Sequence, residues 1–572
     1  MSFIHSFRHP PTPFFGTRAK FALVALCAVV VAAGVRAAGV RAAEVAASGS
    51  AAQPVPSPTP HPGAGPLYIR EYRVEGAHRL APKAVERAVY PFLGPGRSKE
   101  DVEGARTALE KAYREEGYQT VSVQIPEQPE RAVRAGIVVL QVVEMTVGRL
   151  RVKGAHYFLP SEIKKRAPSM KEGSVVNFSE VTRDVVALNQ HPDLRVTPTV
   201  RPGGEPNTVD FDLDVKDTSP LHGSLEVNNR YSADTPELRL NGSVNYNNLW
   251  QLGHSVGFSF QLSPEDVSQV KVFSGYYTFR FSQVPWLALM LQGTKQDSNV
   301  STLGGAAVAG RGEYFGPHVQ ITLPNGKDFY HSINVGIDYK HFEQNIVAAS
   351  STTSTPISYY PISACYSASW INKDEKTQKG NTTEFNGGVN LHLRGMGSGQ
   401  QQFDDSRYDA EGNYIYFKGD LAHTRDLPCD FQVFGKVQGQ ISDQPLINSE
   451  QFSAGGIGTV RGYLESTALA DNSLCGTLEL RTPSLSGWFG GWVGAHMNEW
   501  RFYAFTDAAI LQLRHALPSQ TARFDLASYG IGSHIRFHDH FGGSFDLGVP
   551  LIGQGTVNPH DLLFIFRLWA DF

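Results

Sequence analysis

The sequence predicts an all-β transmembrane barrel of sixteen antiparallel strands, preceded by two small α+β domains. Three observations support this fold class. From about residue 221 onward, apolar and polar residues alternate with a period of two, as in strands with one apolar face. A six-residue pattern near residue 73 returns near residue 151. The N-terminus has the composition of a secretory signal peptide, so we expect the mature chain to act outside the cytoplasm.

The N-terminal segment begins with basic residues, including Arg18 and Lys20, and continues in an apolar run over residues 21–35. Small residues follow, and we expect cleavage between Ala37 and Ala43. A membrane anchor is the alternative, but the run is shorter than the roughly 20 residues that a spanning helix needs. We therefore assign residues 1–43 to a signal peptide. Residues 44–66 are rich in Pro, Ser, Ala and Gly and are assigned to a linker.

The amino-acid composition favours some classes of protein over others. A net charge of −4 over 572 residues gives no support to a nucleic-acid-binding role. The 56 Gly, 33 Phe and 22 Tyr residues are typical of β-proteins with aromatic belts. Of the four cysteines, Cys27 lies in the signal peptide, which leaves Cys365, Cys429 and Cys475. Three is an odd number, so at least one thiol is free, and whether any of them pair stays open.

Two copies of a small domain follow the linker. Residues 73–78 (RVEGAH) return as residues 151–156 (RVKGAH), 78 positions later. In each copy a strand leads to a helix near a proline, then to a second helix and to closing strands, which gives a β-α-α-β-β order. We place the two domains at residues 67–146 and 147–218. Such a fold exposes a strand edge, to which an extended peptide can add as another strand.

The second helix of each copy has the clearest pattern. In the first copy, residues 98–101 (SKED) form a capping-box pattern and Gly117 fits the C-terminal stop. Apolar residues recur at helical spacing between them: Val102, Ala105, Leu109 and Ala112. The equivalent stripe of the second copy consists of Phe178, Val181, Val185 and Leu188.

Residues 219–572 are assigned to the barrel. The alternation is clear in segments such as residues 238–246 and 541–549, and a soluble sandwich would alternate in the same way. The connections favour a membrane barrel, because they are short and long in turn, as periplasmic turns and external loops are. We expect short turns at residues 250–254 and 324–328, and long loops at 297–310 and 343–356.

The end of the chain supports the same prediction. It stops on a predicted strand, residues 562–572, and the candidate strands reach an even number there. Four apolar residues share one face of this last strand: Phe564, Phe566, Leu568 and Phe572.

A glycine-rich stretch, residues 455–463, lies in a long loop between the predicted strands eleven and twelve. It contains Val460, Arg461, Gly462 and Tyr463. In a mobile surface loop Arg461 would be solvated, whereas an arginine that enters a barrel lumen needs an anionic partner, because a desolvated guanidinium is costly. Gly458 and Gly462 are expected to let the backbone bend.

The repeated domains resemble polypeptide-transport-associated (POTRA) domains of two-partner secretion transporters. Residues 116–118 (EGY), 125–128 (IPEQ) and 140–144 (LQVVE) are similar to the first such domain. Residues 188–194 (LNQHPDL) and 201–203 (RPG) are similar to the second. The resemblance implies that both domains are periplasmic and capture unfolded cargo.

Residues 460–463 (VRGY) and 505–509 (FTDAA) resemble the two signature motifs of the superfamily that includes these transporters and barrel-assembly proteins. The resemblance implies that the loop folds back into the lumen and that Arg461 pairs with Asp507 on strand thirteen. The second motif usually ends in glycine, and Ala509 stands there instead. We expect its methyl group to leave the Asp507 geometry intact and to tighten the approach of the loop. The resemblance also marks Phe572 as the signal read by the barrel-assembly machinery.

These observations together predict an outer-membrane transporter of a Gram-negative cell that secretes a partner protein through its barrel. By resemblance, the cargo is a haemolysin- or adhesin-like exoprotein. The other expected partners are outer-membrane lipid and, during biogenesis, the barrel-assembly machinery; no nucleic acid is expected. We expect no enzyme activity, catalytic residue, cofactor or metal, because neither a zinc-protease motif nor a nucleophile elbow occurs. Residues 538–540 (HDH) are expected to form a tight turn.

Two other functions are open to such a chain. An insertase of the same superfamily would share the Arg461 and Asp507 motifs, but such proteins carry three to five POTRA domains rather than two. A passive porin would need neither POTRA domains nor a buried arginine. The transporter family often has an N-terminal plug helix. We expect none here, because residues 44–66 are few and rich in proline, and this leaves the Arg461 loop as the resting seal.

Overall fold

The computed structural model describes residues 67–572, except residues 282, 298–299, 302–307, 310, 327, 349–350, 375–378 and 519. The expected signal peptide, linker and absence of a plug helix concern residues 1–66 and lie outside the described residues. The described chain forms two compact units, one made of residues 67–220 and 247–253, and the other of residues 221–246 and 254–572. None of the described helices has the length and apolar character needed to span a membrane.

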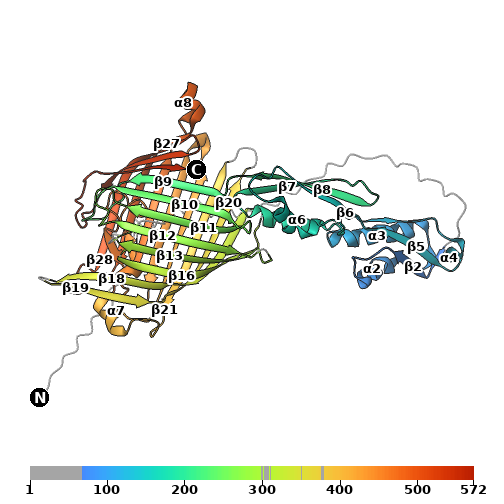
Figure 1. Cartoon of the computed structure of the whole chain (residues 1–572), viewed down its shortest axis with the longest axis horizontal. Helices are drawn as coiled ribbons and strands as arrows, with labels where there is room; N and C mark the ends of the chain where they lie inside the picture. Colours follow the sequence, from blue (N-terminus) through green and yellow to red (C-terminus); the bar gives the residue numbers. More distant parts are fainter. Residues whose placement is uncertain are drawn as a thin grey trace, which may run out of the picture. The chain divides into compact units, whose positions relative to one another are not determined.

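The first unit contains two modules of the same topology (Figure 1). In each, two helices connect a first strand to two further strands, and the first strand runs parallel to the last, which is central. The first module has the sheet order β2-β5-β4 and consists of β2 (Glu71–Glu75), α2 (Pro82–Val89), α3 (Lys99–Glu115), β4 (Ser122–Gln124), α4 (Glu130–Arg134) and β5 (Ile137–Val143), with β1 (Leu67–Ile69) paired to β3 (Gly94–Arg97). The second has the order β6-β8-β7 and consists of β6 (Thr146–Lys153), α5 (Pro160–Lys165), α6 (Phe178–Asn189), β7 (Leu194–Pro202) and β8 (Thr208–Asp217).

Local signals define the helices as the sequence predicts. Ser98 caps α3, since its hydroxyl accepts the backbone N–H of Asp101, and the Asp101 carboxylate accepts that of Ser98. Gly117 follows the helix with φ +93°, and a Cβ there would lie 2.4 Å from the side-chain oxygen of Asn177. The predicted apolar stripes face the cores of their modules, with Leu109 and Leu188 among the buried residues.

The repeated motif, residues 73–78 and 151–156, forms the same tight bend in both modules, and this bend explains why the sequence repeats. Gly76 has φ +79° and Gly154 has φ +80°, a region that favours glycine. Added Cβ atoms would lie 2.4 Å from the Val142 carbonyl oxygen and 2.5 Å from the Val215 carbonyl oxygen, so the bend presses against the central strand in both cases. Glycine is therefore required at both positions.

A carboxylate at the end of each central strand holds the turn that follows this glycine. Glu144 accepts the backbone N–H groups of His78 and Arg79 at 2.8 and 2.9 Å. Asp217 accepts those of residues 156–158 in the second module. Burial acts to raise the pKa of Asp217, but these N–H donors outweigh it and lower the pKa below its ordinary value. The ionised form is thus the one that stabilises the turn.

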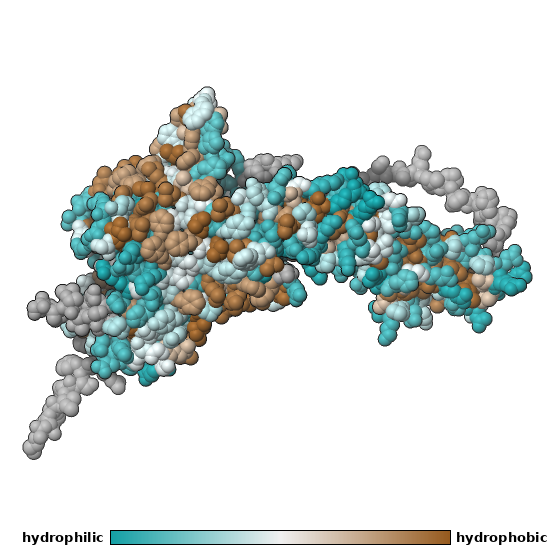
Figure 2. Space-filling model, in the orientation of Figure 1, coloured by the Kyte–Doolittle hydropathy of each residue, from teal (hydrophilic) through white to brown (hydrophobic). Residues whose placement is uncertain are grey.

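The second unit is a closed antiparallel barrel of 16 strands (Figure 1), as the sequence predicts. Two of these strands are interrupted. β17 (Phe329–Ile337) and β18 (Tyr339–Ala348) form one strand broken at Asp338, and β19 (Ser351–Tyr359) and β20 (Ile362–Lys373) form the next. The uninterrupted strands are β9 (Leu221–Asn228), β10 (Arg239–Leu249), β11 (His254–Leu262), β12 (Lys271–Arg280), β13 (Leu287–Asp297), β16 (Arg311–Thr322), β21 (Gly380–His392), β22 (Tyr414–Asp426), β23 (Gln432–Ser442), β26 (Asn472–Arg481), β27 (Met497–Gln512), β28 (Arg523–Phe537), β29 (Phe541–Pro550) and β30 (Leu563–Asp571). Hydrophobic side chains gather in patches over the barrel surface (Figure 2).

The prediction of a long loop is wrong for residues 343–356, whereas the long connection over residues 297–310 joins β13 to β16 and contains a short strand pair. Residues 343–356 form a hairpin, in which β18 and β19 stay paired as far as Ala348 and Ser351. In the segment 297–310, β14 (Val300–Ser301) pairs with β15 (Val308–Ala309). Five of the 14 residues in 343–356 are β-branched (three Thr, one Val and one Ile) and favour extended backbone, so the strands continue where the sequence pattern indicates a loop.

The last strand closes the barrel against the first. β30 pairs with β9, and the pairing extends to the final residue, since the backbone N–H and carbonyl of Phe572 bond to Gly223 at 3.0 and 2.8 Å. The Phe572 ring covers Gly223, where a Cβ would lie 2.6 Å from it. Phe572 therefore contributes both hydrogen bonds and apolar cover to the closing seam, the β30–β9 pair.

Deletion of Phe572, or Phe572→Ser, is expected to reduce the amount of assembled barrel, because unpaired strand edges are not tolerated in lipid. The measurement is the level of heat-modifiable barrel in the membrane fraction. Phe564→Ser is the matched control, since it removes an exposed aromatic from the same face of β30 without touching the chain end. Wild-type levels in the Phe572 deletion would contradict the role assigned to this residue.

Candidate functional site

The loop with the predicted functional residues connects β23 to β26. It contains β24 (Phe452–Ala454) and β25 (Ala468–Ala470), which pair with each other and hold residues 455–467 between them. Gly455, Gly456 and Gly462 have φ values of +108°, +89° and +88°. Gly458 lies in the turn of residues 457–459 but does not have a positive φ. The loop bends at the two preceding glycines and at Gly462.

Arg461 is buried, with 4% of its surface exposed, and its guanidinium faces a set of carboxylates. Its Nε and Nη2 donate to the two oxygens of Asp507 at 2.8 and 2.9 Å, and its backbone N–H donates to the same group at 3.0 Å. Its Nη1 donates to Glu479 at 2.6 Å and lies 3.6 Å from Asp546. Two parallel bonds to one carboxylate fix direction as well as distance. The guanidinium is thus held in one orientation.

An aromatic ring completes the environment of this guanidinium. The Phe505 ring centroid lies 3.6 Å from the Arg461 Cζ atom, which is a close cation–π contact. Phe505 and Asp507 belong to β27 and point to the same side, because alternate residues of a strand share a face. One strand therefore supplies both the charge partner and the packing surface.

Carboxylate groups outnumber cationic groups in the surroundings of Arg461. Glu479 also pairs with Arg481 at 2.7 Å, and Asp546 accepts the Tyr503 hydroxyl at 2.8 Å. Sequence reasoning found Arg461 and Asp507 but missed Glu479 on β26 and Asp546 on β29. Both are single acidic residues between apolar neighbours in strands, and that pattern was the signal available for them.

The other motif residues pack the loop against the barrel wall. Val460 and Tyr463 are fully buried in a cluster with Ala509 and Leu526. The Tyr463 hydroxyl lies 2.7 Å from the Ile552 carbonyl oxygen and 3.0 Å from that of Ala527. The methyl group of Ala509 lies within this cluster, and Asp507 forms its bidentate contact two residues away.

At Gly462 the loop backbone touches strand β29. A Cβ on Gly548 of this strand would lie 2.6 Å from the Gly462 nitrogen, and a Cβ on Gly462 would lie 3.3 Å from Gly548. This close approach, together with the positive φ of Gly462, explains why both positions hold glycine.

A second buried ion pair ties the same loop to the chain that follows β9. Arg230 Nε donates to Glu465 at 2.7 Å, and their side chains are only 8% and 5% exposed. The Glu465 backbone N–H donates to the Tyr231 carbonyl oxygen at 3.0 Å. The loop therefore contacts β26 to β29 on one side of the closing seam and the end of β9 on the other. No sequence motif indicates this pair.

The described residues offer no metal site, since none of their His, Cys, Asp and Glu groups is arranged to hold an ion. Residues 538–540 form the tight turn between β28 and β29, with φ +52° at His538 and φ +54° at Asp539. Cys365, Cys429 and Cys475 are all free. The arrangement around Arg461 is suited to holding a loop in place.

Comparisons with known proteins agree with this architecture. Residues 67–144 match the ShlB-type POTRA domain, and residues 208–535 match the family described as haemolysin secretion/activation protein ShlB/FhaC/HecB. The outer membrane transporter CdiB of Dickeya dadantii is 21% identical over 424 residues, which are 70% of this chain and 70% of that protein. The heme/hemopexin transporter protein HuxB of Haemophilus influenzae is 20% identical over 397 residues, 66% of each. The solved structure of CdiB from Escherichia coli shares the fold, with a TM-score of 0.61 and 18% identity over 91% of this chain and 93% of that one.

Arg461→Ala and Asp507→Ala are expected to have unequal effects on the loop. Loss of Arg461 leaves three acidic groups together, at a local cost on the order of 3 kcal/mol, whereas loss of Asp507 leaves the guanidinium bound to Glu479. Single-channel conductance in planar bilayers should therefore rise more, and fluctuate more, in Arg461→Ala. The double variant should resemble Arg461→Ala, because residues in one network are not additive.

Arg523→Ala is the control for these variants, because Arg523 is exposed and pairs only with nearby Asp525 among the described residues. It should conduct as the wild type does. If the two single substitutions have equal effects, and these effects add in the double variant, then Arg461 and Asp507 act separately.

Proposed function

The chain belongs to the family of haemolysin secretion/activation proteins. On this basis we propose a role in secretion for each of its parts. It is an outer-membrane transporter of the two-partner secretion type, which exports a partner exoprotein, and its POTRA region is periplasmic. We propose that the POTRA modules capture the cargo as an extended chain and that the Arg461 loop is a lock inside the barrel. The observation that carries the proposal is the complete set of contacts that holds Arg461.

The first POTRA module has a surface suited to an extended polypeptide. Strand β4 is at the edge of its sheet, and the free N–H and C=O groups of such an edge can form backbone hydrogen bonds with an added strand. Past the end of this strand, at the start of β5, lies a hollow of about 470 Å³ with a mainly apolar lining, which includes Tyr68, Val102, Ile125, Val133 and Ile137. Backbone pairing tolerates many sequences, while the hollow favours apolar side chains at alternate positions.

The cargo must pass the Arg461 loop to leave the cell. The loop tip is held by Asp507 and Glu479 on one side of the seam and by Arg230 on the other, so its displacement requires these contacts to break. The periplasm supplies no ATP. We propose that folding of the cargo outside the cell draws the chain outward, and that the loop returns to its carboxylates afterwards.

The alternative function, an insertase of barrel proteins, fits less well. Residues 208–535 match the secretion/activation family, and the described residues contain two modules of one topology, the first of which matches a POTRA domain, whereas the insertases have three to five such domains. A haemolysin- or adhesin-like exoprotein remains our proposal for the cargo. Recognition of Phe572 by the barrel-assembly machinery is likewise proposed.

Removal of residues 67–146 is expected to abolish secretion while the barrel still assembles. A finer test is Ile125→Glu with Val133→Glu, which places two charges in the apolar hollow and should lower secreted cargo about tenfold, equivalent to roughly 1.4 kcal/mol of lost binding. Both side chains are partly exposed, so the module should still fold. The measurement is cargo in the medium relative to assembled barrel.

Arg131→Glu is the matched control for the hollow, since it changes a charge on the same short helix, α4, outside the lining. It should secrete as the wild type does. Wild-type secretion by the variant with both glutamates would show that the hollow does not receive cargo.

The Arg230–Glu465 pair is expected to work as a second anchor of the lock. Glu465→Arg alone sets two cations together in a buried place, so it should raise the resting conductance of the pore and lower secretion. Exchange of the charges, Arg230→Glu with Glu465→Arg, should restore both towards wild type. If the exchange is as defective as the single variant, the pair does not act as an anchor.

A further inference from the structure

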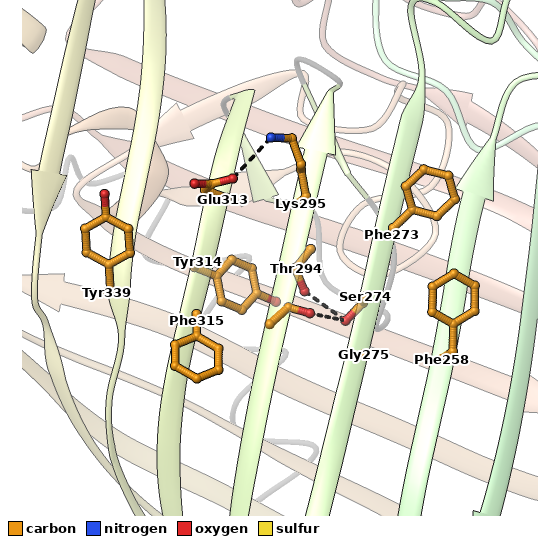
Figure 3. A pocket seen from close by; sticks show the side chains of 11 residues that line it. Phe258, Phe273, Ser274, Gly275, Thr294, Lys295, Glu313, Tyr314, Phe315 and Tyr339 are labelled. Atoms are coloured by element: carbon orange, nitrogen blue, oxygen red, sulfur yellow. Dashed lines mark hydrogen bonds and ion pairs between the residues drawn. The ribbon is translucent and has the colours of Figure 1, made fainter.

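The outward face of the barrel has a hollow of about 350 Å³ across strands β11, β12, β13 and β16 (Figure 3). Successive residues of these strands alternate between faces. Thr294 donates to Ser274 at 2.8 Å on the polar, luminal face. Gly275 and Gly293 are the next residue of β12 and the preceding residue of β13, so they belong to the opposite, outward face. The hollow therefore opens to the surroundings of the barrel rather than to its lumen.

The floor of this hollow consists of two glycines that the fold itself does not require. The strand register sets Phe258 opposite Gly275, Gly275 opposite Gly293, and Gly293 opposite Phe315. An added Cβ would meet its nearest atom at 3.6 Å on Gly275 and at 3.4 Å on Gly293, which are ordinary contact distances. At Gly257, by contrast, a Cβ would lie 2.3 Å from the Tyr276 ring. Side chains would thus fit at both floor positions.

Aromatic rings form the walls. Phe258 and Phe273 stack with their centroids 6.0 Å apart on one side, and Phe315 and Tyr339 stand on the other (Figure 3). The strands that carry Phe258 and Phe315, β11 and β16, lie three strand spacings apart, roughly 14 Å at about 4.8 Å for each spacing. In lipid, the side chains that border an unfilled gap lose dispersion contacts, and a flexible acyl chain that fills the gap restores these contacts.

Charged residues lie above the hollow at the extracellular ends of the same strands. Lys295 pairs with Glu313 at 3.2 Å, and both line the hollow (Figure 3). Lys271 and Arg311 stand 3.8 and 3.6 Å from Asp297 at the next outward positions. The Lys295 side chain is 75% exposed, and an ammonium has three donors, so it can bind a phosphate oxygen as well as Glu313. The apolar hollow thus has cationic groups at its extracellular end.

We propose that this hollow is a binding site for an anionic lipid of the outer leaflet that bears phosphomonoester groups, as distinct from a zwitterionic phospholipid. One acyl chain lies on Gly275 and Gly293 between the aromatic walls, and the phosphate contacts Lys295 and the neighbouring cations. The inference rests on the outer-membrane location of the barrel and is independent of the secretion mechanism. The barrel surface already faces lipid, so the site needs no other partner.

The test uses the full-length protein, delipidated in mild detergent and then mixed with diphosphoryl lipid A or with phosphatidylcholine. Native mass spectrometry counts the lipid that stays bound. The wild type should retain one lipid A per chain and prefer it to phosphatidylcholine. Gly275→Leu with Gly293→Leu fills the hollow and should lower retention about tenfold. Val319→Phe, an outward position on β16 outside the hollow, should retain lipid as the wild type does.

Two further variants keep the test decisive. Lys295→Gln with Arg311→Gln should remove most of the preference for lipid A and leave the retention of phosphatidylcholine unchanged. If the double leucine variant fails to assemble, Gly293→Ala takes its place, with an expected loss of about threefold. Wild-type retention in the filled variants would overturn the site. Equal retention of the two lipids by the wild type would overturn the phosphate contact and with it the proposed ligand.

Discussion

The contact between the Arg461 guanidinium and its carboxylates fixes the position of the whole functional loop. A charge removed from water is stable only when its partners are placed correctly, and here Asp507 binds it through two parallel bonds while Glu479 binds a third donor. The other features of the loop follow from this contact. Gly462 allows the backbone to touch β29, and Tyr463 is buried in the apolar cluster that packs the loop against the barrel wall. The bends at the glycines of the loop bring Arg461 to its carboxylates, and the bonds of Arg461 in turn keep the loop in this bent conformation.

Much of the fold could be predicted because its signals are local. Alternation along single strands indicates the barrel, and Ser98 and Gly117 mark the ends of one helix. The repeated RVxGAH pattern proved to encode one bend, in which glycine avoids a carbonyl oxygen. Such signals need no knowledge of distant partners. The interpretation of residues 343–356 as a loop was wrong because strand pairing can continue beyond the point where the pattern weakens.

The site was predicted only in part, since its remaining contacts depend on registers between distant segments. Arg461 and Asp507 were found through motifs, but Glu479 and Asp546 reach the arginine only because the sheet register aligns β26, β27 and β29. Arg230 and Glu465 are 235 positions apart and meet because the first and last strands close the barrel. No pattern within either segment indicates that meeting. Closure of the sheet is a global property, and these contacts are its result.

The interruptions at Asp338 and at Tyr360–Pro361 bear on the mechanics of the barrel. They lie in the seventh and eighth strands, about half the circumference away from the seam that the Arg461 loop bridges. At the interruption the wall is held by the backbone bond from Asp338 to the Pro361 carbonyl oxygen and by the contact of Asp338 with His318 at 3.0 Å. A closed sheet that is pushed outward from its lumen deforms first where the hydrogen-bonded ladder between its strands is interrupted. The bridged seam is reinforced, so radial compliance is concentrated in the opposite wall.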